Sequence, residues 1–265
     1  MAFETIILKK EEGIATLILN RPDKGNSLSR QMLEELVAAL DEVARDKEVR
    51  VLILTGAGRG FCGGGDTSEL GEGGIYNQGV ETNRQFIRQV TQKITLSLRR
   101  LEIPTIAMVN GFAAGGGLEY ACACDIRIGS ENARFASAFV RVGLTTETGG
   151  HYLLPRIVGL GRAFEILYTG NWVGAKEAER IGLLNRVVPA NDLQKETMEL
   201  AKQLAKAPPL SIRLTKQLVN KAIETDLETA LQMSASYQAI AMSSQDHQEG
   251  IAAWREKREP VYQGK

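Results

Sequence analysis

The chain carries Val109-Asn-Gly-Phe-Ala-Ala-Gly-Gly-Gly-Leu-Glu119 directly after an apolar run that begins at Thr105. A second glycine cluster, Leu54-Thr-Gly-Ala-Gly-Arg-Gly-Phe-Cys-Gly-Gly-Gly-Asp66, follows another short apolar run, Val51-Leu-Ile-Leu. Short, wholly apolar runs are typical of strands covered on both faces of a mostly parallel sheet. Ligands bind at the carboxyl ends of the strands in open α/β sheets. The sequence therefore predicts an α/β fold in which both glycine clusters belong to one site.

Two segments of the first half have apolar residues at helical spacing. One extends from Leu33 to Val43, and Ser29 is its expected N-cap. The other is expected to form a single helix over 79–100 that connects the two apolar strands. A β-hairpin is expected before them, over 5–19.

The last third of the chain is predicted to be helical. Helices are expected at 163–168, 175–181, 192–205, 211–223 and 227–242. No repeat of 20 to 50 residues and no Pro/Ser-rich linker divides the chain. We predict an α/β core over 1–200 and a helical C-terminal region over 201–265 that packs on itself or on a neighbouring subunit.

Composition excludes several functional classes. The 265 residues include 32 basic and 32 acidic side chains without a long run of like charge, which argues against general nucleic-acid binding. The longest uncharged apolar stretch, 103–118, is broken by proline, asparagine and glycines, so no membrane span is expected. The N-terminal Met1-Ala-Phe-Glu4 does not resemble a signal peptide, and a cytoplasmic location is the expectation.

Cysteine and histidine are too few for a convincing metal site. The Cys122-Ala-Cys124 spacing is closer than the two to four intervening residues usual for zinc thiolates. Only His151 and His247 could complete such a site. We therefore expect no metal and interpret Cys62, Cys122 and Cys124 as small core residues. His151 is expected to be structural, because no nucleophile can be placed beside it.

Glycine is the unusual component, with 27 residues or about a tenth of the chain against a typical ~7%. Gly58-Arg-Gly-Phe-Cys-Gly63 has the spacing of a dinucleotide fingerprint, but the residues after it do not open a helix. Tight turns explain some glycines. A third interpretation is that glycines let backbone N–H groups approach a ligand oxygen and form an oxyanion hole. Gly65 and Gly116 are the candidate donors.

Five segments in order carry a family resemblance: Asn20-Arg-Pro-Asp-Lys-Gly-Asn-Ser-Leu28, Gly60-Phe-Cys-Gly-Gly-Gly-Asp66, Val109 to Asp125, Leu154-Pro-Arg-Ile-Val-Gly159 and Gly250-Ile-Ala-Ala-Trp-Arg-Glu-Lys-Arg258. With them the chain resembles the crotonase family of enoyl-CoA hydratases and isomerases. The resemblance implies a ClpP-like spiral of ββα units with a helical trimerisation region. It also implies an acyl-CoA thioester as the substrate, no further cofactor, and a homotrimer or a dimer of trimers.

The resemblance also implies which residues meet the substrate. The thioester carbonyl would accept bonds from the N–H groups of Gly65 and Gly116. Residues expected to contact the substrate are Lys24, Cys62, Gly63, Asp66, Phe139, Leu144 and, from a neighbouring chain, Lys257. The segment 67–80 is expected to line the acyl pocket. Each lysine alone is also typical of a solvated surface charge.

Two acidic residues decide the expected reaction. Glu119 matches the first of the two glutamates of family hydratases, but Phe139 stands where the second belongs. Glu147 matches the acidic residue of family isomerases, and one carboxylate near C2 and C4 can move a proton between them. We predict an enoyl-CoA isomerase with Glu147 as the proton shuttle. The alternative interpretations are a helix N-terminal charge for Glu147 and a core aromatic for Phe139.

Two other functions remain open. The first is an enoyl-CoA or cyclic dienoyl-CoA hydratase in which Glu119 activates water. The second is a non-catalytic or RNA-binding member of the fold, which would require a basic face near Arg99-Arg100 or over 202–221. Acidic and apolar residues interrupt both of these segments, so the RNA-binding interpretation is disfavoured.

Overall fold

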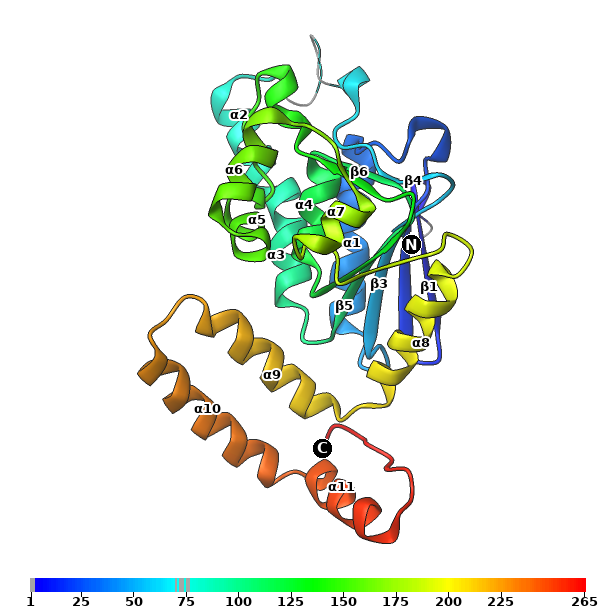
Figure 1. Ribbon diagram of the computed structural model, residues 1–265, viewed down its shortest axis with the longest axis vertical. Helices are drawn as coiled ribbons and strands as arrows, with labels where there is room; N and C mark the ends of the chain where they lie inside the picture. The colour runs from blue at the N-terminus through cyan, green and yellow to red at the C-terminus, as the bar shows by residue number, and fades with distance from the viewer. Residues whose placement is uncertain (1–2, 70, 72–73, 75–76) are drawn as a thin grey trace.

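The computed structural model describes residues 3–69, 71, 74 and 77–265, and its strands form two sheets (Figure 1). The six-stranded sheet has the order β1 (Ile6–Glu11), β2 (Ile14–Leu19), β3 (Val51–Gly56), β5 (Thr105–Val109), β7 (Ile126–Ser130) and β10 (Arg186–Val188). The four-stranded sheet has the order β4 (Gly60–Cys62), β6 (Phe112–Ala114), β8 (Arg134–Ala136) and β9 (Val173–Gly174). Strands β1 and β2 form the predicted hairpin.

Consecutive strand pairs build the predicted spiral. Strand β3 joins the large sheet and β4 the small one, and the pairs β5/β6 and β7/β8 repeat this division. The neighbours β3, β5 and β7 are parallel, and so are β4, β6 and β8. Each turn of the spiral therefore places its strand-to-strand connection at the same end of the molecule. The α/β spiral expected from the sequence is confirmed.

The helices are α1 (Arg30–Arg45), α2 (Val80–Phe86), α3 (Gln92–Arg100), α4 (Gly116–Ala123), α5 (Gly150–Val158), α6 (Leu160–Thr169), α7 (Ala175–Arg180), α8 (Leu193–Lys206), α9 (Pro209–Ala222), α10 (Leu227–Met242) and α11 (Gln245–Glu256). Ser29 caps α1 as predicted, since its side chain accepts a bond from the N–H of Met32. Short 3₁₀ turns lie at Pro22–Lys24, Thr67–Glu69 and Ala138–Val142.

Both faces of β3 are buried, which explains its wholly apolar sequence. Leu52 and Leu54 belong to the main core cluster, which includes the buried faces of α1, α3 and α4. Val51 and Ile53 point to the opposite face and pack in a second cluster with residues of α8. Helix α8 thus covers the sheet from the other side, and the predicted boundary at residue 200 falls within it.

The single helix predicted over 79–100 is wrong in one respect. A π-helical turn, Ile87–Thr91, separates α2 from α3. The buried hydroxyl of Thr91 donates to the carbonyl of Ile87, four residues earlier, at 3.0 Å. A π turn contains one residue more than an α-helical turn. The sequence does not reveal this residue, because the apolar stripe continues from α2 into α3.

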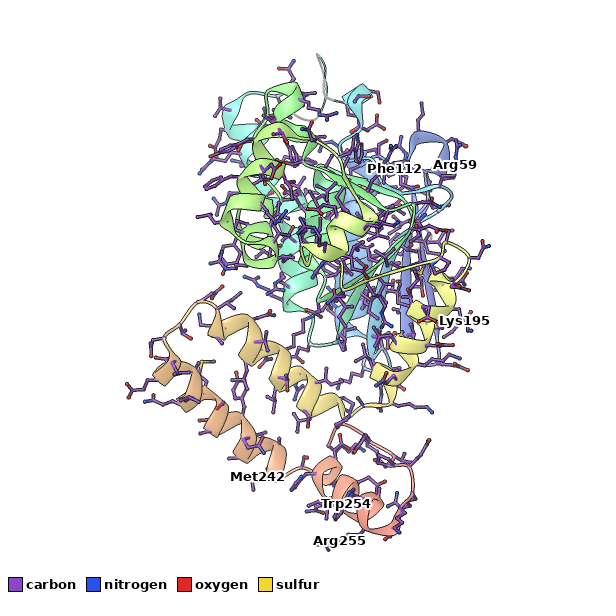
Figure 2. The ribbon with its side chains drawn as sticks, viewed as in Figure 1. Arg59, Phe112, Lys195, Met242, Trp254 and Arg255 are labelled. Carbon is purple, nitrogen blue, oxygen red and sulfur yellow. The ribbon has the colours of Figure 1, made fainter. Side chains whose placement is uncertain are left out.

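The C-terminal helices α9, α10 and α11 extend from the core instead of covering the sheets (Figure 1). Helix α10 has no buried residue and α9 has one, Leu214. Met242 and Trp254 project from the far end of these helices, at 57% and 80% exposure (Figure 2). This region leaves apolar surface uncovered in a single chain.

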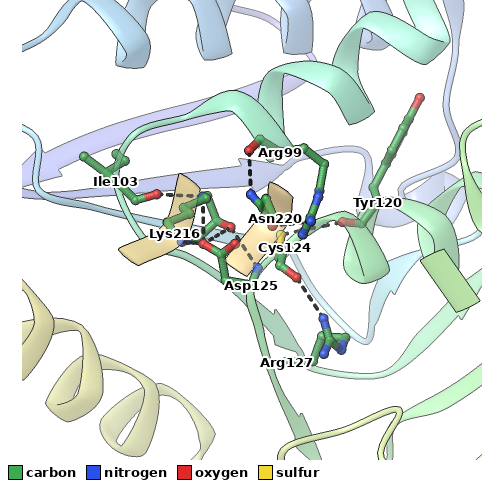
Figure 3. A network of polar contacts seen from close by, with 9 residues as sticks. Arg99, Ile103, Tyr120, Cys124, Asp125, Arg127, Lys216 and Asn220 are labelled. Atoms are coloured by element: carbon green, nitrogen blue, oxygen red, sulfur yellow. Dashed lines mark hydrogen bonds and ion pairs between the residues drawn. The ribbon is translucent and has the colours of Figure 1, made fainter. Parts of the chain in front are cut away.

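A polar network attaches α9 to the core (Figure 3). The ammonium of Lys216 lies 2.7 Å from a carboxylate oxygen of Asp125 and donates to the carbonyl of Ile103 at 2.8 Å. The same carboxylate oxygen accepts from the backbone N–H of Thr105 at 2.8 Å. The Lys216 side chain is mostly buried, so its charge is paired and hydrogen-bonded as a buried ammonium requires. This network fixes the direction in which α9 leaves the core.

Candidate active site

The two glycine clusters meet in space. A side chain at Gly64, which has a φ of +88°, would place its Cβ 2.9 Å from the carbonyl oxygen of Ala114. A Cβ on Gly115, with a φ of +50°, would lie 3.8 Å from the Cα of Gly64. Only glycine fits the positive φ angles and the close backbone approach at this crossing. The segment 58–63, which has the spacing of a dinucleotide fingerprint, contains strand β4 and does not open a helix. This excludes the interpretation as a dinucleotide-binding loop.

The predicted N–H donors, Gly65 and Gly116, lie around one residue, Leu28. Gly65 pairs with Leu28 in a parallel bridge whose hydrogen bonds use the Gly64 carbonyl and the Asp66 N–H. This geometry turns the N–H of Gly65 away from Leu28. Gly116 begins α4, where an N–H has no acceptor within the helix, and a Cβ there would lie 2.9 Å from Leu28 Cδ1. The structure thus brings both donors together.

The segment around Lys24 is held against the first glycine loop. Asn26 is buried, and its amide donates to the carbonyls of Ala57 and Gly60, both at 2.8 Å. The N–H of Gly63 donates to the carbonyl of Gly25 at 2.9 Å. Lys24 itself is exposed on the neighbouring turn. Asn26 lies in the segment 20–28, before helix α1. Its structural role was not predicted from the sequence.

Asp66 is a buried carboxylate with strong partners. Its oxygen lies 2.8 Å from a guanidinium nitrogen of Arg21, and it accepts from the hydroxyl of Ser68 at 2.7 Å. Burial alone would raise the pKa of Asp66, but the bonds from Ser68 and Arg21 outweigh burial and hold that pKa at about 2. Asp66 therefore remains ionised and fastens the end of the glycine loop to the segment of Arg21.

We expect ionisation of the Asp66 carboxylate to contribute to the pH dependence of the free energy of unfolding. Because the folded-state pKa of Asp66 is depressed, its stabilisation is complete above the unfolded-state value and is lost as the pH falls toward 2. The wild type should lose about 2 kcal/mol more free energy of unfolding than Asp66→Asn between about pH 5 and pH 2, measured by urea denaturation. Asp23→Asn, on an exposed neighbouring turn, should keep the wild-type pH dependence. Equal pH profiles for wild type and Asp66→Asn would refute this role.

Cys62 contributes its backbone and its packing volume rather than thiol chemistry. Burial raises the pKa of its thiol to about 12. A Cβ on Gly117 would lie 2.7 Å from the carbonyl oxygen of Cys62, so α4 packs directly on β4 at this point. Cys122 and Cys124 are also free and buried, which confirms the interpretation of all three as core residues.

Glu119 is 1% exposed, and its carboxylate receives three hydrogen bonds from one short segment. Thr146 and Thr148 donate through their hydroxyls, and the N–H of Thr148 donates at 2.7 Å. A Cβ on Gly150 would come within 2.3 Å of a carboxylate oxygen of Glu119, so only glycine fits there. Neither threonine was identified from sequence, since their spacing around Glu147 has no meaning until the chain folds.

Glu147 stands between those two threonines. Glu147 is half-buried, and its backbone carbonyl accepts a bond from the side-chain amide of Gln92 at 3.1 Å. It lies two residues before Gly149, the N-cap of α5, and therefore outside the first helical turn. Glu147 lines a cleft of about 820 Å³ between α3 and α5 on one side and α9 and α10 on the other.

Phe139 and Leu144 lie beside the second glycine loop. A Cβ on Gly115 would be 3.7 Å from the Phe139 ring, so the ring lies next to the residue that precedes Gly116. The N–H of Leu144 donates to the carbonyl of Phe139 at 2.9 Å, and Leu144 is 47% exposed. An aromatic ring therefore stands at the rim of the site. Phe139 is half-buried, which leaves the interpretation as a core aromatic open.

Lys257 and His151 are not part of the two glycine loops. Lys257 ends α11 with a φ of +55° and is exposed in the C-terminal region, far from the glycine loops of the same chain (Figure 1). The backbone N–H of His151 donates to the hydroxyl of Thr146 at 3.2 Å, and the residue is exposed, so the structural role of its side chain stays a prediction. The expected acyl-pocket segment 67–80 includes positions 70, 72–73 and 75–76, which lie outside the described residues.

A two-sheet spiral of repeated strand pairs, in which two glycine loops meet, is the crotonase fold. A family model described as enoyl-CoA hydratase/isomerase matches residues 9–265, and the chain belongs to this family. It is 39% identical to the crotonyl-CoA hydratase of Syntrophomonas wolfei over 97% of both chains. It is 37% identical to the 1,2-epoxyphenylacetyl-CoA isomerase of Escherichia coli over 99% of both.

Solved structures agree with this assignment. The enoyl-CoA hydratase of Bacillus anthracis superimposes with a TM-score of 0.93 at 35% identity, covering 99% of this chain and 100% of that one. Within the described residues, no three His, Cys, Asp or Glu side chains gather as a metal site. No helix of this part of the chain is long and apolar enough to cross a bilayer.

Proposed function

We propose that the protein is an enoyl-CoA isomerase in which Glu147 carries the proton. The observation that supports this assignment is the different environment of the two acidic residues. Glu119 is buried and bonded by both threonines that flank Glu147, whereas Glu147 is half-buried and lines a cleft. A carboxylate that exchanges protons with a substrate must be less enclosed than Glu119, and Glu147 is the less buried of the two.

The reaction would begin with the thioester carbonyl bound by the N–H groups of Gly65 and Gly116. These donors stabilise the enolate that forms when Glu147 removes a proton from C2 of a 3-enoyl thioester. Electrons of the enolate then re-form the carbonyl, the C2–C3 bond becomes double, and C4 takes the proton back from Glu147. No water or further cofactor is consumed, and the product is the 2-enoyl thioester.

Hydration is the second candidate function. Relatives named as hydratases favour it, among them the one from Syntrophomonas wolfei. Of the roughly four lone-pair positions of a carboxylate, Glu119 uses three for Thr146 and Thr148. One position is left to orient a water. In this alternative Glu119 would activate the water and Glu147 would supply the proton to C2.

Binding of the CoA portion is proposed for the first glycine loop and its neighbour. Lys24 supplies an exposed positive charge next to Gly63. The backbone over 62–66 would contact the pantetheine arm, and Lys257 would come from a neighbouring chain. Phe139 and Leu144 would line the acyl side, where a flat ring favours a flat or cyclic acyl group.

Assembly into a homotrimer or a dimer of trimers is also proposed. One apolar surface lies on α9 and α10 and includes the exposed Val219, Leu227, Leu231 and Met242. A different one lies on α6 and the loop that follows it and includes the exposed Leu160, Phe164, Tyr168 and Trp172. Two unlike apolar surfaces on one chain favour a heterologous contact that closes into a ring.

The test of the proposed function is a screen of straight, branched and cyclic enoyl-CoA thioesters. Each 3-enoyl and 2-enoyl substrate is incubated with the protein, the ultraviolet change is followed, and the product is identified. We expect conversion of 3-enoyl to 2-enoyl thioesters to exceed water addition. Exclusive formation of 3-hydroxyacyl products across the screen would reject the isomerase and favour Glu119-dependent hydration.

A further inference from the structure

The segment that bears Glu147 is tied to helix α3 as well as to Glu119. The hydroxyl of Thr95 donates to the carbonyl of Thr148, and the amide of Gln92 donates to the carbonyl of Glu147 at 3.1 Å. Both donors come from more than 50 residues earlier in the chain, so neither bond follows from local structure. Two consecutive carbonyls of the segment are therefore fixed from outside.

We infer that Gln92 and Thr95 are positioning residues for Glu147, an inference that rests on the proposed function. They stand three residues apart on α3, which places both on one face of the helix. Helix α3 begins at Gln92, directly after the π-helical turn Ile87–Thr91. Gln92 bonds the carbonyl of Glu147, and Thr95 bonds the carbonyl of the next residue, Thr148.

Glu119 completes the arrangement from the opposite side. Its carboxylate holds the N–H and hydroxyl of Thr148 and the hydroxyl of Thr146. Glu119 is also three residues after Gly116 on α4. One rigid helix therefore carries an oxyanion donor and the anchor of the base, while α3 restrains the remaining freedom of the segment. The backbone of Glu147 is fixed on both sides, and its position relative to the oxyanion donors is set by packed helices.

This arrangement has a kinetic consequence. Proton transfer depends steeply on geometry, and a displacement of about 1 Å can cost about 100-fold in rate. Thr95 is 9% exposed, and its hydroxyl donates to the carbonyl of Thr148, a residue not proposed to bind CoA. Loss of its hydroxyl should therefore lower kcat and leave KM for the thioester nearly unchanged.

The test compares Thr95→Val with a matched control. Thr91→Val also removes a buried threonine hydroxyl, one turn earlier, but that hydroxyl bonds only within its own helix, to Ile87. We expect Thr95→Val to lower kcat for isomerisation about 10-fold to 100-fold with KM within about twofold, and Gln92→Met to lower it in the same direction. Thr95→Ser, which keeps the hydroxyl, should restore the rate. An equal loss in Thr91→Val and Thr95→Val would overturn the inference.

A double-mutant cycle separates this inference from the proposed function. If Thr95 acts through Glu147, Thr95→Val should lose its effect when added to Glu147→Gln. A full and additive effect on that background would overturn the positioning role while leaving Glu147 as the base. If Glu147→Gln alone keeps the wild-type rate, the proposed function fails, whatever Thr95→Val does.

Discussion

Replacement of Glu147 by glutamine is expected to lower kcat for 3-enoyl-CoA isomerisation by about 10²-fold to 10⁴-fold, the range that a positioned acid–base group contributes. Glutamine keeps the shape of the side chain and cannot take a proton from C2. KM for the thioester should change little, because the contacts proposed for CoA lie in the first glycine loop. The rates are measured by the ultraviolet change on formation of the 2-enoyl thioester.

The control for this substitution is Glu165→Gln. Glu165 is an exposed glutamate on α6, and within the described residues its carboxylate makes no hydrogen bond or ion pair. This variant should keep the wild-type kcat and KM. A Glu147→Gln protein with an unchanged isomerisation rate would remove Glu147 from the mechanism.

The second large effect is expected at Gly116. Gly116→Pro removes the N–H proposed to bind the thioester oxygen, and proline is accepted at the first position of a helix. Gly115, with φ +50° and ψ −122°, has the mirror image of the extended conformation favoured before proline, and glycine adopts that conformation readily. Loss of one oxyanion donor costs about 10²-fold to 10³-fold in kcat, and we expect a loss of that size for any acyl-CoA reaction in this site.

Gly116→Ala is the matched control for this substitution. Alanine adds the same Cβ, 2.9 Å from a terminal methyl of Leu28, but it keeps the N–H. The contact falls on the end of a flexible side chain that can move, so alanine should reduce kcat far less than proline does. Equal losses for alanine and proline would show that steric displacement, rather than the missing donor, explains the effect.

Hydropathy and glycine placement were sufficient to predict the central architecture. The short apolar runs over 51–54 and 105–109 predicted two buried strands, and the glycine clusters after them predicted the place of the site. The short strands of the second sheet have two or three residues and are too short to show a period in the sequence. Only their pairing in space defines them, which is why they were expected from the family resemblance alone.

Site residues could be predicted where the residue type itself has a distinctive property. They could not be predicted where a common residue type acts through a partner far away in the sequence. Gly65 and Gly116 were found because glycine exposes backbone N–H groups. Thr95 and Gln92 look like ordinary helical residues, and their bonds to the segment of Glu147 span more than 50 positions. The C-terminal helix α11 was missed for a related reason, since its outward face has no partner within the chain and gives little hydrophobic periodicity.

Identification of the product formed from one 3-enoyl-CoA thioester by the wild type, Glu147→Gln and Glu119→Gln tests the central claim most directly. Isomerisation leaves the mass unchanged, whereas hydration adds one water. The account predicts that the wild type forms the isobaric 2-enoyl thioester and that Glu147→Gln does not. A wild type that leaves the 3-enoyl thioester unchanged, but hydrates the 2-enoyl thioester in a reaction that disappears in Glu119→Gln, would contradict it.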